Sequence, residues 1–163
     1  MNSLEDICYW IEELPLSLAI GESWLFPFIE TLHVIAAVFV LGSIMVVDLR
    51  LLGWSAISHR LTTMVRESIL WTWIAFAVAL ITGVGMFITR ASGYLNNPAF
   101  LWKIVLLLFA GINMLYFHRR LWPRIQMQPS AVIALPAQRV VGAISLTVWL
   151  GIMLAGRWIG HIF

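Results

Sequence analysis

The chain is dominated by four long apolar stretches, at residues 24–47, 68–89, 99–118 and 140–162. Each is long enough for an α-helix, rising about 1.5 Å per residue, to cross the roughly 30 Å hydrocarbon core of a bilayer. Transmembrane β-strands are excluded, because the stretches lack the alternation of barrel strands and lipid offers no partner for an open sheet edge. The pattern predicts an all-α fold, a four-helix transmembrane bundle.

Residues 1–23 have a different pattern, in which apolar positions recur at helical spacing among acidic ones. Ser3 is suited to cap a helix, Asp6 follows three residues later, and Pro15 would end the helix. The segment lacks the basic leader of a secretory signal, so we expect it to remain in the mature protein. We predict a short amphipathic helix on the outer membrane surface. Its apolar positions are Leu4, Ile7, Ile11 and Leu14.

Composition supports one membrane domain, residues 1–163. Hydrophobic residues make up 61% of the chain and charged residues 11%, whereas soluble domains are about half apolar and a quarter charged. The spans and their loops leave no room for a soluble catalytic domain. The net charge of +2 comes with basic residues concentrated in two loops, which membrane topology explains. The expected partner is therefore the lipid bilayer and not nucleic acid, and a single cysteine excludes an internal disulfide.

Basic residues are distributed unevenly between the loops. The segment before the first span has none, and the loop between the second and third spans has only Arg90. Because Lys and Arg accumulate in cytoplasmic loops, both termini are predicted to lie outside (N-out/C-out), in a multi-pass protein of the bacterial inner membrane. The arginines on the predicted inner side are Arg50, Arg60, Arg66, Arg119, Arg120, Arg124 and Arg139.

Ionisable residues inside the spans are the best indicators of function, because a charge within a bilayer is costly. Glu30 and His33 share one face of the first span, well inside the outer half. Lys103 enters the third span, and Arg157 leaves the fourth, on the same side. We interpret His33 as an axial ligand of a haem iron, with Lys103 and Arg157 binding the haem propionates. The alternative is a buried ion network of Glu30 with Lys103 or Arg157, and a histidine that hydrogen-bonds a neighbouring helix.

Other histidines give weaker indications. His161 shares a face with Arg157 but lies nearer the surface than His33, and His118 ends the third span on the inner side. Each is a weak candidate for a further haem ligand. Glu30 and His33 also match one copy of the motif that di-metal carboxylate bundles use twice, so Glu30 is a weak candidate for a metal ligand.

Two further features are expected to be structural. Asp48 and Arg50, at the inner end of the first span, most simply form a local pair at the membrane interface. Gly151 and Gly156 begin small-residue motifs in the fourth span, which permit close helix approach within the bundle or to a partner subunit.

Several short segments carry a resemblance to known membrane proteins. They are Glu30-Thr31-Leu32-His33, Gly42 followed by Asp48-Leu49-Arg50-Leu51-Leu52-Gly53, Phe100-Leu101-Trp102-Lys103 and Ala155-Gly156-Arg157-Trp158. With these segments the chain resembles a group of small, functionally uncharacterised bacterial four-helix membrane proteins, over nearly the whole span region. More distantly, it is similar to the bacterial oxygen-independent protoporphyrinogen oxidase and to the copper-resistance D-type membrane domain.

The resemblance to the oxidase family implies a cofactor. That family binds haem b and has a helix-one histidine in a Leu-His setting and a helix-three lysine. Leu32-His33 and Trp102-Lys103 match these positions, and we carry over only these. The chain departs from the family in its acidic N-terminal helix, in Glu30 and in Arg157.

Three functions follow as hypotheses. The leading one is a haem b-binding electron-transfer protein, an oxidoreductase component that links the quinone pool to an outer-side redox protein. The second is a cofactor-free accessory subunit that stabilises a larger membrane complex by contacts with partner membrane subunits. The third is the handling of copper or another ion by Glu30, His33 and His161.

Overall fold

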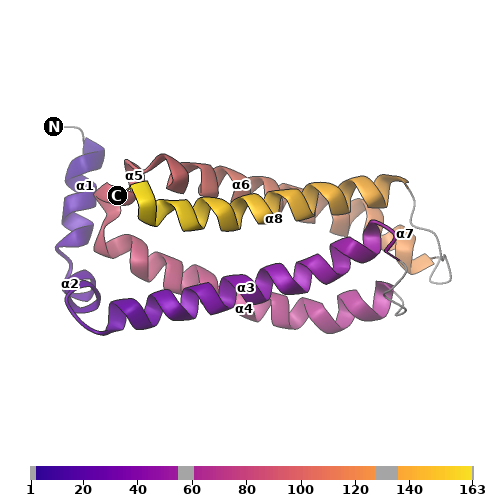
Figure 1. Cartoon of the computed structure of the whole chain (residues 1–163), viewed down its shortest axis with the longest axis horizontal. Helices are drawn as coiled ribbons and strands as arrows, with labels where there is room; N and C mark the ends of the chain where they lie inside the picture. The colour runs from indigo at the N-terminus through magenta and orange to yellow at the C-terminus, as the bar shows by residue number, and fades with distance from the viewer. Residues whose placement is uncertain (1–2, 55–60, 128–135, 163) are drawn as a thin grey trace.

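The computed structural model describes residues 3–54, 61–127 and 136–162, which form a bundle of long helices (Figure 1). Four of these helices are long and apolar enough to cross a membrane, which confirms the predicted all-α, four-helix transmembrane fold. The sidedness of the bundle stays a prediction, and Arg60, on which it partly rests, lies outside the described residues. The spanning helices are α3 (Leu25–Leu51), α4 (Leu61–Thr89), α6 (Pro98–Tyr116) and α8 (Pro136–Ile162).

The outer surface of the spanning helices is apolar. Ile35, Ile81, Leu108 and Leu154, one from each helix, are between 60% and 71% exposed. Exposing such side chains to water is unfavourable, whereas lipid is as apolar as they are. The exposure is therefore that of helices surrounded by lipid.

The four spans pack as two pairs. α3 lies along α4, α6 lies along α8, and the pairs meet mainly through α3 and α8. α4 and α6 make few contacts with each other. The bundle is therefore loosest between α4 and α6.

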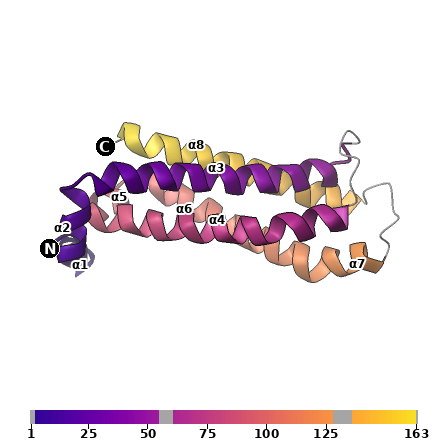
Figure 2. The ribbon, with the colours of Figure 1, turned by 90° about the horizontal axis from the view of Figure 1, so that it is seen from below.

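Both ends of the chain lie at one end of the bundle, which we call the terminal end; α7 lies at the other, the loop end (Figures 1 and 2). Short helices cover the terminal end, where the sequence predicted only one. Pro15 does not simply follow the first helix but begins a second one. The N–H groups in the first turn of a helix have no partner within the helix, so a proline, which lacks this group, is well suited to that position. The short helices are α1 (Ser3–Glu12), α2 (Pro15–Gly21) and α5 (Ala91–Leu95).

Side-chain hydrogen bonds attach these short helices to the bundle. Oε1 of Glu12 accepts from both the backbone N and the Oγ of Ser92, each at 2.7 Å. The Ser17 hydroxyl donates to the carbonyl of Ile88 at 2.8 Å. α1 is thereby held to α5, and α2 to the end of α4.

Asn97 determines where α6 begins. Its Oδ1 accepts from the backbone N of Ala99 at 3.0 Å and of Phe100 at 3.3 Å, as a helix N-cap does. Its Nδ2 donates to the carbonyl of Ile159 in α8 at 3.1 Å. One buried side chain therefore caps α6 and fixes it to its partner helix.

The loop end is closed by a continuation of α6 and by a close helix contact. α6 continues through a π-helical turn (Phe117–Leu121) into α7 (Trp122–Met127). A Cβ on Gly142 of α8 would lie 2.9 Å from Cβ of Leu51 and 3.0 Å from the backbone oxygen of Asp48. Only glycine lets α8 approach α3 this closely without a shift of either helix.

Candidate functional site

His33 is half-buried on α3, and its imidazole ring is bound to α4. Nδ1 lies 2.8 Å from the carbonyl oxygen of Ala79 and 3.1 Å from Oγ1 of Thr82. A carbonyl oxygen can only accept, so Nδ1 carries the proton and donates it to Ala79. The Thr82 hydroxyl donates to Val78 of its own helix at 2.6 Å. Nε2 is therefore the nitrogen that carries the lone pair and could coordinate a metal.

The ring of His33 packs directly on the backbone of α4. A Cβ on Gly83 would lie 3.1 Å from Cε1 and 3.5 Å from Nδ1 of His33. Because the first of these distances is shorter than an ordinary van der Waals contact, the missing side chain at Gly83 leaves the room that the ring occupies. We call His33, Ala79, Thr82, Gly83 and Lys103 the histidine site.

Lys103 reaches the histidine site from the other helix pair. It is half-buried on α6, and its Nζ lies 3.6 Å from the position that a Cβ on Gly156 of α8 would take. Its charge is also near enough to act on His33. The two residues to which the family resemblance pointed therefore lie close enough for the charge of Lys103 to act on His33.

The other residues predicted for this site lie on the exposed surface. Arg157 and His161 of α8 are exposed, and so is Glu30. Burial raises the pKa of Tyr94 in α5, and the charge of Glu30 raises it further, while Arg90 lowers it. Glu30 is thus near the short helices of the terminal end, whereas Arg157 and His161 are exposed near the end of α8.

The described residues also bear on the ion-handling hypothesis. Within residues 3–54, 61–127 and 136–162, no three His, Cys, Asp or Glu side chains are grouped so that they could hold a metal ion. Glu30, His33 and His161 therefore do not form a common site. A haem iron needs only one or two side-chain ligands, so the haem hypothesis is unaffected.

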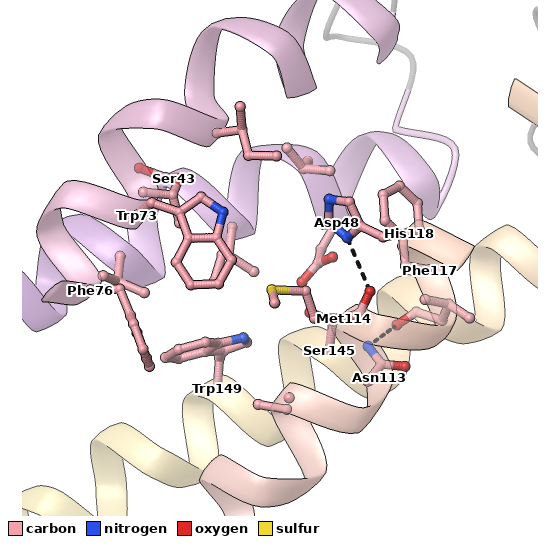
Figure 3. A pocket seen from close by; sticks show the side chains of 18 of the residues that line it. Ser43, Asp48, Trp73, Phe76, Asn113, Met114, Phe117, His118, Ser145 and Trp149 are labelled. Carbon is pink, nitrogen blue, oxygen red and sulfur yellow. Dashed lines mark hydrogen bonds between the residues drawn. The ribbon is translucent and has the colours of Figure 1, made fainter. Parts of the chain in front are cut away.

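A pocket lies in the loop-end half of the bundle, between all four spans (Figure 3). It holds about 180 Å³ of space that the centres of water molecules can reach, whereas about 10–15 Å³ suffices for one water. Its walls are mostly apolar, and each of the four spans contributes to them. We call it the aspartate pocket, after Asp48 in its wall.

Asp48 is only 4% exposed and belongs to the interior of the bundle. Its carboxylate has a hydrogen bond with the side chain of Ser145 in α8. Oδ2 of Asp48 and Nε of Arg50 are both buried, and neither has a hydrogen-bond partner among the residues that the structure describes. The predicted interfacial pair of Asp48 and Arg50 is therefore wrong, because α3 continues through Leu51 and carries Asp48 into the core.

His118 lines the same pocket rather than the histidine site. It lies half-buried in the π-helical turn, and its Nδ1 donates to the carbonyl of Met114 at 3.0 Å. Nearby, Nδ2 of Asn113 donates to the carbonyl of Val141 at 3.3 Å. Turns of this kind widen a helix and are frequent at functional sites.

The two ends of the aspartate pocket differ in character. Figure 3 shows Asp48, Ser145 and His118 on one side and the rings of Trp73, Phe76 and Trp149 on the other. The rings of Trp73 and Phe76 meet edge to face, with centroids 5.9 Å apart. The pocket therefore suits a molecule with a planar apolar body and one polar end. The ring-bearing residues are Trp73 and Phe76 of α4 and Trp149 of α8.

Residues 20–162 match the model of a family of unknown function (DUF6644). The chain belongs to this family. No curated protein and no solved structure matches it. The DUF6644 match contains every residue of the histidine site and of the aspartate pocket, and it leaves out α1.

Asp48 is the residue that the sequence analysis placed wrongly. The buried residues of α3 include Ala36, Val40, Asp48 and Leu51, whose spacings of four, eight and three place them on one helix face. Asp48 therefore continues an apolar stripe that begins in the middle of the span. Treating the stripe as continuous through Leu51 would have placed this carboxylate in the core.

Proposed function

We propose that this DUF6644 protein binds haem b at the histidine site and transfers electrons between the quinone pool and a redox protein at the terminal end, as an oxidoreductase component. The supporting observation is the His33 ring, whose Nδ1 donates to Ala79, so that Nε2 is the ring nitrogen that carries the lone pair. Metal-binding histidines almost always donate their other ring N–H to a carbonyl, carboxylate or water, which fixes the tautomer and orients the ring. His33 has this arrangement.

The residues around His33 fit a large planar cofactor. The ring of His33 lies on α4 and Lys103 belongs to α6, and these two helices make few contacts with each other. Gly83 and Gly156 carry no side chains where His33 and Lys103 lie. Nε2 of His33 would hold the iron, and the Lys103 ammonium would pair with a propionate carboxylate. Exposed Arg157, next to Gly156 in sequence, is the proposed anchor of the second propionate.

The chain's own residues would act on the cofactor in three ways. A bound haem supplies a one-electron iron couple. His33 holds its coordinating nitrogen in one tautomer, the apolar spans exclude water, and Lys103 places a cation nearby. A nearby cation favours the reduced state, which carries one positive charge fewer. Lys103 is therefore expected to raise the reduction potential, and Lys103→Met to lower it.

An absorption spectrum of the purified full chain tests haem binding. Protein from haem-replete cells should show a Soret band and, after reduction, an α-band. His33→Gly should lose both bands, and added imidazole should restore them by replacing the missing ligand. His161→Gly, a histidine on the exposed surface of the same end, is the matched control and should keep both. Colourless wild-type protein would overturn the proposal.

The cofactor-free accessory subunit makes the opposite prediction. It expects His33→Gly to be tolerated and the chain to co-purify with a larger assembly. In the structure, Gly151 faces Leu106 and Gly156 faces Lys103, both on α6. These two small residues are therefore used for packing within the bundle and do not form a free contact surface.

A further inference from the structure

The aspartate pocket contains a polar atom to which the protein gives no partner. Asp48 is 4% exposed, and its Oδ2 has no hydrogen bond with any part of the chain that the structure describes. Burying a carboxylate oxygen without a donor is costly, so such atoms require an explanation. Figure 3 shows this carboxylate directed into the pocket. A ligand with a hydrogen-bond donor is the explanation that the pocket favours.

The polar neighbours of Asp48 are already engaged. The Ser145 side chain is hydrogen-bonded to the carboxylate itself. Nδ1 of His118 donates to Met114, and Nδ2 of Asn113 donates to Val141. A bound molecule that carries an O–H group would supply the donor that Oδ2 lacks.

The aromatic residues of the pocket indicate which apolar group the ligand carries. Trp73, Phe76 and Trp149 line the end away from Asp48. Aromatic side chains favour another ring in stacked or edge-to-face contact. The ligand therefore combines a planar ring with a hydroxyl group at its edge.

The position of the pocket indicates how a ligand enters. Trp73 and Met114 line it, yet they are 49% and 41% exposed on the surface of the spans. They belong to α4 and α6, the two spans that make few contacts with each other. A molecule dissolved in the bilayer therefore reaches the pocket between these helices.

We propose that the aspartate pocket binds the head group of a lipid-soluble quinol, with one ring hydroxyl donating to Oδ2 of Asp48. The ring lies among Trp73, Phe76 and Trp149, and the apolar tail leaves between α4 and α6. A hydrophobic amine also carries a donor, but a quinol carries its donor on a planar ring, which the aromatic end of the pocket favours. The assignment to quinols rests on the redox function proposed above, for which the quinol is the electron donor. Binding itself is measurable without haem.

The test is the binding of decylubiquinol to the full chain in detergent, followed by quenching of tryptophan fluorescence. Asp48→Asn should raise Kd about tenfold or more, because it removes the acceptor Oδ2 of the proposed hydrogen bond from the quinol hydroxyl. Asp6→Asn, which changes an exposed carboxylate on α1, is the matched control and should leave Kd unchanged. Trp149→Phe should reduce the amplitude of quenching, because this indole lies in the pocket wall.

A second ligand keeps the test valid if Asp48→Asn does not fold. The dimethyl ether of decylubiquinol has the same ring but no hydroxyl donor. It should bind the wild-type chain about tenfold more weakly than the quinol and should bind Asp48→Asn no more weakly than it binds the wild type. Equal binding of quinol and ether to the wild-type chain would overturn the inference, as would a hydrophobic amine of similar size that binds more tightly than the quinol.

The two proposals can fail separately. His33→Gly should lose the haem bands and keep decylubiquinol binding, whereas Asp48→Asn should keep the bands and bind decylubiquinol about tenfold or more weakly. A colourless chain whose quinol binding depends on Asp48 overturns the haem proposal alone. A coloured chain that binds the quinol equally with and without Asp48 overturns the pocket assignment alone.

Discussion

The two ends of the bundle differ in whether their buried polar side chains have hydrogen-bond partners. At the terminal end, Asn97 uses both ends of its side-chain amide, and Ser17 and Glu12 bond neighbouring helices. At the loop end, Oδ2 of Asp48, in the wall of the pocket, and Nε of Arg50 are buried without a hydrogen-bond partner among the described residues. The terminal end is therefore constructed for stability, whereas the loop end retains hydrogen-bonding capacity for a ligand. Substitutions at the terminal end should accordingly cost more stability than the removal of the unpaired carboxylate.

The largest effect is expected from Asn97→Ala. The substitution removes the N-cap of α6 and the buried hydrogen bond to Ile159 in α8, together about 2–3 kcal/mol. Asn96→Ala is the matched control, because Asn96 is exposed and bonds only Ser92 of its own short helix. The control should change stability by less than about 0.5 kcal/mol. Thermal unfolding in detergent, followed by circular dichroism, compares the two variants, and equal losses would show that the terminal end does not depend on Asn97.

Gly142→Ala is expected to cost somewhat less, about 1–2 kcal/mol. The added methyl group would lie 2.9 Å from the side chain of Leu51 and 3.0 Å from the backbone oxygen of Asp48, so α8 has to move away from α3. Gly42→Ala meets nothing within 4 Å and should stabilise the helix slightly, by about 0.5–1 kcal/mol. Unfolding under the same conditions measures both. The same sign of change for both variants would contradict the close approach of α3 and α8 at the loop end.

The sequence predicted the spans well because their signal is continuous. Four apolar stretches identified four helices, since in lipid the whole outer surface of a helix is apolar. The residues at which the helices begin and end are marked less clearly in the sequence. α3 continues to Leu51 past Asp48, where the charge suggested an interface, and Pro15 begins a helix as well as following one.

The candidate site was only partly predictable for a related reason. His33 and Lys103 stand out as ionisable residues in apolar surroundings, and the structure brings them together. Arg157 and Lys103 look equivalent in sequence, but Lys103 faces α8 and Arg157 is exposed. Which way a side chain points depends on helix rotation, which is set by contacts far apart in the chain, such as that of Gly83 with His33.

Glu12→Ala is expected to cost about 1 kcal/mol, because it removes the acceptor of two hydrogen bonds from Ser92 at a partly exposed position. Glu13→Ala is the matched control on the neighbouring, exposed residue and should have little effect. The loss should be local, so hydrogen exchange at the backbone of α1 and α5 is the appropriate measurement. If exchange became equally fast in Glu13→Ala, the negative charge of this segment, and not the hydrogen bonds between Glu12 and Ser92, would be what attaches α1 to α5.

The smallest effect on stability is expected from Asp48→Asn, less than about 0.5 kcal/mol. The amide keeps an oxygen for the hydrogen bond with Ser145, and it replaces a buried charge whose Oδ2 has no partner. Removing such a charge relieves a desolvation cost, which offsets the weaker remaining bond. Ser145→Ala should cost more, about 1 kcal/mol, because it leaves the charge with no donor at all.

The unfolding temperatures of these two variants decide whether the loop end differs from the terminal end. A loss of about 2 kcal/mol or more in Asp48→Asn without ligand would mean that the carboxylate stabilises the fold as Asn97 does. Added decylubiquinol sharpens the result, since a ligand that binds only the folded state raises its stability. It should raise the unfolding temperature of the wild-type chain, because the quinol hydroxyl donates to Oδ2 of Asp48. The unfolding temperature of Asp48→Asn should stay nearly unchanged, because this variant lacks that acceptor.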